Sequence, residues 1–140
     1  MQNTLRIFIL AASVVLSATA FGQQKSTDAG KQEFEISCAI CHGMDAKGNG
    51  MMSEALKVKP TDLTLLAKKN GGVFPIDYVT RVIDGRGSIK IHGSRDMPIW
   101  GTRYSINAAE HYVDVPYDQE AYVRSHILAL VDYLYRLQQK

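Results

Sequence analysis

The sequence Cys-Ala-Ile-Cys-His at residues 38–42 constrains this chain more than any other feature. Cys38 and Cys41 are its only cysteines, and His42 directly follows the second one. Two cysteines at this spacing can belong to a disulfide, a zinc site, a redox-active dithiol or a covalently attached haem. Each of these sites needs different partners elsewhere in the chain, so the rest of the sequence decides between them.

The first three of these sites are poorly supported by their surroundings. A structural zinc ion takes four ligands, but the chain has no second cysteine pair, and His92, His111 and His126 do not have the required spacing. A redox dithiol is expected beside a βαβ unit, whereas a helix-compatible stretch and a glycine-rich loop flank this motif. A simple disulfide would leave His42 without a role.

Covalent haem attachment uses all three residues of the motif. Cys38 and Cys41 each form a thioether with a vinyl group on the same edge of the porphyrin, and His42 then lies over the ring and ligates the iron. The sequence therefore predicts one covalently bound haem c with His42 as the proximal iron ligand.

A second axial ligand must come from another part of the chain. The side chains able to supply sulfur or nitrogen are Met44, Met51, Met52, Met97, His92, His111 and His126. The methionines that closely follow the motif would need a sharp return of the chain to reach the opposite face of the ring. Met97 lies in a distant loop before Pro98, which fixes the backbone and has no N–H, and His/Met is an established haem pairing. We therefore predict Met97 as the distal ligand, with His92 as its rival.

The N-terminal segment has the layout of a secretory signal peptide. Arg6 precedes an apolar run and then small residues that suit cleavage after Ala20 or Gly22. The apolar run is shorter than the roughly 20 residues of a spanning helix. The sequence predicts that residues 1–22 are removed and that residues 23–140 form one exported or periplasmic domain without a membrane span. An uncleaved N-terminal anchor is the alternative.

Composition and charge limit the other classes of function. The chain has 140 residues, of which 46% are hydrophobic and 21% charged, as is typical of a single globular domain. Its formal net charge is +2, and the basic residues are scattered. A nucleic-acid-binding domain normally carries a dense basic patch, so we predict no nucleic-acid partner.

Helix signals dominate the mature chain, and no strand-like alternation of useful length competes with them. Aspartates suited to capping and apolar residues spaced three or four apart predict helices over residues 28–37, 61–70, 76–84 and 118–140. Glycine-rich loops are expected over residues 43–60 and 85–98. The predicted fold class is all-α, and its modest core implies that the protein without haem is largely unfolded.

The chain resembles the class I c-type cytochromes over nearly all of its mature length. The resemblance is carried by the segments "CAICHG", "KGNG", "PTDLT", "MPIWG" and "LALVDYLYRLQ". It implies a cytochrome c-like fold, in which short helices wrap around one covalently attached haem. In this family an N-terminal helix crosses a C-terminal helix, and here Gly30 and Phe34 match the first helix while Leu130 and Tyr133 match the second. Residues 101–117 are longer than in the shortest members and receive no assignment.

The same resemblance implies the arrangement of the site. Cys38 and Cys41 are expected as haem thioethers, His42 as the proximal iron ligand and Met97 as the distal one. Pro60 is expected to accept a hydrogen bond from the second ring nitrogen of His42.

An iron with both axial positions filled by the protein favours one-electron transfer over enzymatic activity. The partners expected are a redox protein donor and acceptor, such as membrane-bound respiratory or dehydrogenase complexes. One alternative is a haem-based sensor or peroxidase-like enzyme with a labile distal ligand, which would need an acid–base residue over the iron, such as His92. Another is a small electron-transfer subunit of a larger respiratory or dehydrogenase complex.

Overall fold

The computed structural model describes residues 27–87, 97–111 and 118–139, with only the backbone of His111. Within these ranges the chain is a small all-α domain with six α-helices and no strand. The predicted signal peptide at residues 1–22 and the rival ligand His92 lie outside the described residues. No helix among the residues described is both long enough and apolar enough to cross a membrane.

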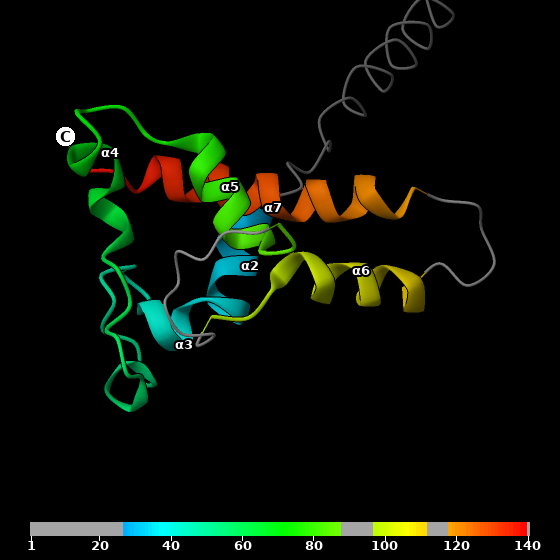
Figure 1. The fold of residues 1–140 in the computed structure, drawn as a ribbon, viewed down its shortest axis with the longest axis horizontal. Helices are drawn as coiled ribbons and strands as arrows, with labels where there is room; N and C mark the ends of the chain where they lie inside the picture. Colours follow the sequence, from blue (N-terminus) through cyan, green and yellow to red (C-terminus); the bar gives the residue numbers. More distant parts are fainter. Residues whose placement is uncertain (1–26, 88–96, 112–117, 140) are drawn as a thin grey trace, which may run out of the picture.

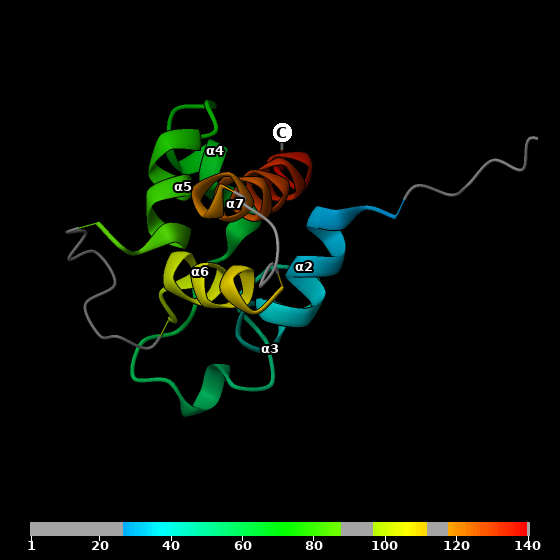
Figure 2. The ribbon, with the colours of Figure 1, turned by 90° about the vertical axis from the view of Figure 1, so that its right-hand side faces the viewer.

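A long helix near the C-terminal end of the chain forms the centre of the domain (Figure 1). The α-helices are α2 (Ala29–Ser37), α3 (Ala39–His42), α4 (Leu66–Lys69), α5 (Ile76–Asp84), α6 (Trp100–His111) and α7 (Gln119–Arg136), with 3₁₀ turns at Ser53–Ala55 and Leu63–Leu65. Figure 2 looks along α7 and shows α2 and α5 on opposite sides of it and α6 beneath. The buried apolar residues of α7 therefore face three helices at once.

Side-chain caps fix the helix starts that the sequence predicted. Asp28, Asp62 and Asp118 each accept a backbone N–H in the first turn that follows, at 3.0, 2.9 and 3.1 Å. Such caps satisfy N–H groups that have no partner inside the helix. Gly85 ends α5 in the left-handed region, with a φ of 66°. A helix lies in each of the four predicted regions, although the last one ends at Arg136 and not at residue 140, and the second begins as a 3₁₀ turn. Residues 43–60 contain only one short 3₁₀ turn.

Helix α6 lies mostly within residues 101–117, for which no structure was predicted. Trp100, Tyr104 and Ala108 recur every fourth residue and are all buried, so their spacing was the available helical signal. Gly101 hides this signal because glycine disfavours helix. The structure gives a reason for the glycine: an added Cβ would collide with the side chains of Asp84 and Arg86.

The crossing of α2 and α7 depends on the absence of a side chain at position 30. A Cβ added to Gly30 would collide with the carbonyl oxygen of Ala129 and lie 2.9 Å from Cβ of Tyr133. One turn further along α2, the rings of Phe34 and Tyr133 pack with their centroids 5.4 Å apart. The predicted contact of Gly30 and Phe34 with Tyr133 is confirmed, and Leu130 is buried in the same core.

We expect Gly30→Ala to destabilise the protein by about 2 kcal/mol or more, because the added methyl group forces the two helices apart. The measurement is the free energy of unfolding in urea. Gly87→Ala is the matched control, since a Cβ there meets no atom of the described residues within 4 Å. Equal effects of the two substitutions would contradict the close crossing.

The ends of α2 and α7 are also joined by a bidentate ion pair. Asp28, the cap of α2, accepts hydrogen bonds from Arg136 at 2.7 and 3.0 Å. The Arg136 guanidinium, assisted by the Lys31 backbone N–H, lowers the pKa of Asp28 from its ordinary 3.8 to about 2. The pair therefore holds the first and last described helices together while the carboxylate is ionised.

A lowered folded-state pKa contributes stability that is present above the unfolded value and lost as the pH falls through the folded one. For Asp28 this window lies between pH 3.8 and about 2. We expect the melting temperature of wild type to exceed that of Asp28→Asn at pH 6, and the gap to narrow at pH 2.5. A constant gap across this range would argue against the pair.

Candidate cofactor site

A cavity of about 310 Å³ opens between α2, α3, α5, α7 and the segments that carry residues 56–66 and 97–100. Most of its lining is apolar, with contributions from Phe34, Leu56, Leu66, Val79, Ile83 and Leu134. Cys38, Cys41, His42 and Met97 also line this cavity. The structure thus brings together all four site residues that the sequence predicted, although Met97 is far from the motif along the chain.

The imidazole of His42 is oriented by a backbone carbonyl. His42 is the last residue of α3, and its Nδ1 lies 3.2 Å from the carbonyl oxygen of Thr61, so the Nδ1-protonated tautomer donates to that carbonyl. The expectation that Pro60 accepts this bond is wrong by one residue. The Pro60 carbonyl faces Gly48 instead, where an added Cβ would collide with it.

The glycine-rich loop after the motif folds back onto α3. Gly48 and Gly50 donate backbone N–H bonds to the carbonyls of His42 and Cys41, at 2.7 and 3.0 Å. These carbonyls lie at the C-terminal end of a helix and have no partner within it. Gly48 has a φ of 81°, and a Cβ on Gly50 would press against the backbone of α3. The loop therefore closes the end of α3 tightly and fixes the place of His42.

The candidate sulfur ligands differ in whether they line the cavity. Met44 and Met51 are 65% and 83% exposed, and neither they nor Met52 lines the cavity. Among the methionines of the described residues, Met97 alone lies at the cavity, where it is half-buried against the core. His126 lies on α7 away from the lining.

The state of the two cysteines argues against dithiol chemistry. Cys38 and Cys41 are not joined by a disulfide. Burial, followed by the negative charge of Glu33 and then Cys41, raises the pKa of Cys38 to about 12. A redox-active dithiol depends on a thiol whose pKa is lowered, so Cys38 is not set up as a nucleophile. Nor do three His, Cys, Asp or Glu side chains gather into a metal cluster within the described ranges.

The segment that orients His42 is itself held by the C-terminal end of the chain. The Gln138 side chain accepts from the Ala67 N–H at 2.9 Å and donates to the Leu63 carbonyl at 2.8 Å. The backbone N–H of Gln139 adds a bond to the Thr64 carbonyl at 2.9 Å. The position of the Thr61 carbonyl therefore depends on contacts made after α7 ends.

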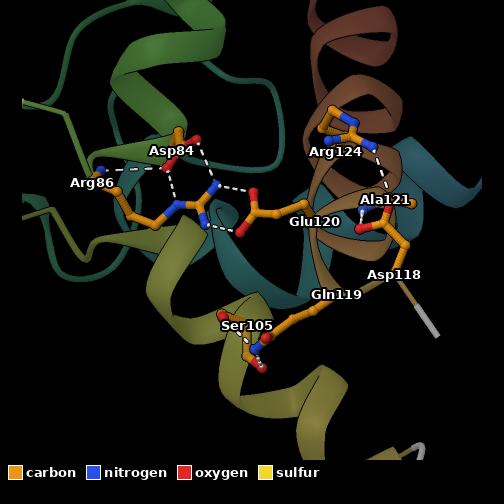
Figure 3. A network of polar contacts seen from close by, with 8 residues as sticks. All are labelled: Asp84, Arg86, Ser105, Asp118, Gln119, Glu120, Ala121 and Arg124. Carbon is orange, nitrogen blue, oxygen red and sulfur yellow. Dashed lines mark hydrogen bonds and ion pairs between the residues drawn. The ribbon is translucent and has the colours of Figure 1, made fainter. Parts of the chain in front are cut away.

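An ion network fixes the region between α5 and α6 (Figure 3). Arg86 donates to Asp84 at 2.6 and 3.0 Å and to Glu120 at 2.6 and 3.0 Å, as Figure 3 shows. These hydrogen bonds from Arg86 lower the pKa of both carboxyl groups. Gly101, near the start of α6, packs against the side chains of Asp84 and Arg86. The network therefore joins the end of α5 to the starts of α6 and α7.

Comparison of the chain with protein-family models, curated proteins and solved structures finds no match. The interpretation of the cavity therefore rests on the residues and geometry of this chain alone.

The residues at the cavity fit a covalently bound haem. The cavity volume of about 310 Å³ and the apolar lining are typical of a cofactor site. Cys38 and Cys41 supply thiols for two thioether bonds, and His42 has its Nδ1 engaged by a carbonyl, the arrangement usual for a metal-bound histidine. Met97 supplies a thioether sulfur from another part of the lining. These donors are the set that a His/Met-ligated haem c requires.

Proposed function

We propose that this chain is an exported mono-haem c-type cytochrome that carries single electrons between redox partners. Cys38 and Cys41 hold the haem covalently, and His42 and Met97 ligate its iron. The observation that carries the proposal is the convergence of these four residues on one apolar cavity. The all-α fold and the α2–α7 crossing support the further proposal of a cytochrome c-like fold wrapped around the haem.

Each residue at the site has a part in electron transfer. When bound, the haem supplies a one-electron couple. Thr61 orients His42, and the thioether of Met97 favours the reduced state and so raises the potential. The apolar lining keeps water out and lowers the local dielectric constant, which acts in the same direction. If His42 and Met97 both ligated the iron, they would leave no open coordination site for oxygen or peroxide.

The lining offers little to a peroxidase or sensor. A peroxidase needs an acid–base group near the open axial position. Apart from the motif, the titratable side chains that line the cavity in the described part of the chain are Lys59 and Tyr78. His92, the acid–base residue considered for such a role, lies outside the described residues. The convergence of Cys38, Cys41, His42 and Met97 on one cavity supports an electron carrier. The proposed partners are a redox donor and acceptor, such as membrane-bound respiratory or dehydrogenase complexes.

The test is to export the full chain from cells able to attach haem and to examine the purified protein. We expect haem that stays with the chain on a denaturing gel, reversible one-electron reduction, and ferrous protein that does not bind CO rapidly at neutral pH. Absence of covalent haem would overturn the proposal. Covalent haem combined with rapid CO binding would instead support a sensor or a peroxidase.

A further inference from the structure

A partly buried carboxylate next to the cavity has no part in the proposed electron transfer. Glu33 lies on α2, and its side chain is only 19% exposed. Its Oε1 accepts hydrogen bonds from the hydroxyls of Tyr104 and Ser37, both at 2.8 Å. Its Oε2 lies 3.5 Å from Nδ1 of His126. A carboxylate, an imidazole and two hydroxyls from three parts of the chain thus form one polar cluster inside the helix bundle.

The cluster is in contact with the cavity wall on two sides. Ser37, which donates to Glu33, lines the cavity beside Cys38. Trp100 also lines the cavity, and its ring packs 6.1 Å from the ring of Tyr104. The negative charge of Glu33 is one cause of the raised pKa of Cys38, so this charge is felt at the proposed point of haem attachment.

The opposite side of the cluster reaches solvent through His126. Its side chain is 31% exposed, and its ring packs between Tyr104 and Tyr122, at centroid distances of 4.9 and 4.4 Å. The imidazole can therefore exchange a proton with water while it stays held against Glu33.

Among the residues that the structure describes, few titratable groups face this pair. They are Tyr104 on α6 and Tyr122 on α7, together with Cys38 at the junction of α2 and α3, whose thiol no longer titrates once it holds the haem. Burial, then the hydrogen bond to Glu33, raises the pKa of Tyr104, so its hydroxyl remains a donor at neutral pH. Other charges on α2 and α7 pair away from the cluster, as in Lys31 with Glu35, Arg124 with Asp118 and Arg136 with Asp28. Glu33 and His126 therefore form the contact between a carboxylate and an imidazole in this cluster.

We propose that Glu33 and His126 form a proton-binding site linked to the redox state of the iron, an inference that rests on the proposed function. When a redox donor passes one electron to the ferric centre, the site loses one unit of positive charge. One proton from solvent then binds the pair, giving an imidazolium held against the Glu33 carboxylate. When the electron leaves to an acceptor, the proton returns to solvent. Charge near the haem is balanced in both steps.

The linkage fixes the sign of the pH dependence. A reduced centre binds the proton more tightly, so the midpoint potential falls as the pH rises through the range in which imidazoles titrate. We expect a threefold to tenfold gain in proton affinity on reduction, because the pair is partly screened from water and touches the cavity wall through Ser37. A one-electron couple converts this gain to a fall of about 30 to 60 mV between pH 5 and 8.5.

The test is a spectroelectrochemical titration of the haem-loaded protein over this pH range. His126→Gln and Glu33→Gln should each flatten the dependence, and both replacements keep hydrogen-bonding atoms in the cluster. Asp132→Asn is the charge control: it also removes one carboxylate, from a residue of α7 that is 66% exposed and paired with Arg136, and it should keep the wild-type slope. NMR of the histidine rings should show His126 titrating at higher pH in the ferrous than in the ferric state.

The outcomes separate this inference from the proposed function. Normal covalent haem with a potential that does not change with pH would overturn the proton site and leave the electron carrier intact. A wild-type slope in both cluster variants would also overturn the site, because another group would then bind the proton. Failure to attach haem at all would overturn the proposed function on which the inference rests.

Discussion

Replacing both Cys38 and Cys41 with serine is expected to have two effects. The variant should retain no haem on a denaturing gel, and it should lose most of its tertiary structure. The cavity of about 310 Å³ lies between the helices that form the core. Without the ring, the apolar side chains that line this cavity lose their packing contacts and are exposed to water. A small domain has only about 5–15 kcal/mol of net stability with which to offset that loss. A form without haem therefore has little or no net stability.

The measurement has two parts, haem staining of a denaturing gel and urea unfolding followed by circular dichroism. The double Cys→Ala variant is the control for the buried hydroxyl of serine and should lose haem and structure to the same extent. Each single serine variant keeps one thiol and should retain part of the haem. If the haem-free protein instead melts cooperatively at the temperature of the wild type, the fold does not depend on haem filling the cavity.

Met97→Ala is expected to change the chemistry while leaving haem attachment intact. Removing the thioether opens one axial position, so the Met–iron charge-transfer band should disappear and ferrous protein should bind CO rapidly. The potential should fall by on the order of 100 mV or more, because axial ligands shift haem potentials over several hundred millivolts. The variant would turn a carrier of electrons into a binder of small ligands.

Met51→Ala is the matched control for this variant. Met51 is 83% exposed and does not line the cavity, so its removal should change neither the spectrum nor the potential. An unchanged spectrum in Met97→Ala would show that another residue ligates the iron, and His92 would be the next variant to examine.

The parts of the fold that could be predicted from the sequence are those set by neighbouring residues. Asp28 and Asp118 cap helices through hydrogen bonds to the next turn, and Gly85 ends α5 by its own conformation. The spacing of Cys38, Cys41 and His42 is equally local. Met97 could be selected from the sequence because His/Met is a known haem pairing and because the other methionines lie too close to the motif to reach the opposite face of the ring.

The parts that could not be predicted depend on distant contacts. Helix α6 was obscured by Gly101, whose reason is the packing of Asp84 and Arg86 against it. The choice of Thr61 over Pro60 as the partner of His42 depends on which carbonyl the loop turns inward. The cluster around Glu33 joins residues 71 positions apart in the hydrogen bond from Tyr104. No periodicity or motif in the sequence encodes such pairs.

The contacts of the C-terminal residues have a consequence for the order of biogenesis. The motif at Cys38 is synthesised early, whereas α7 and Gln138, which close the core and hold the segment around Thr61, follow about a hundred residues later. Contacts so distant in sequence form late, because the intervening chain must first be ordered. Until then Cys38 and Cys41 remain in an unfolded chain and are accessible. If haem is attached as proposed, we expect attachment to precede the packing of α7, which then completes the fold.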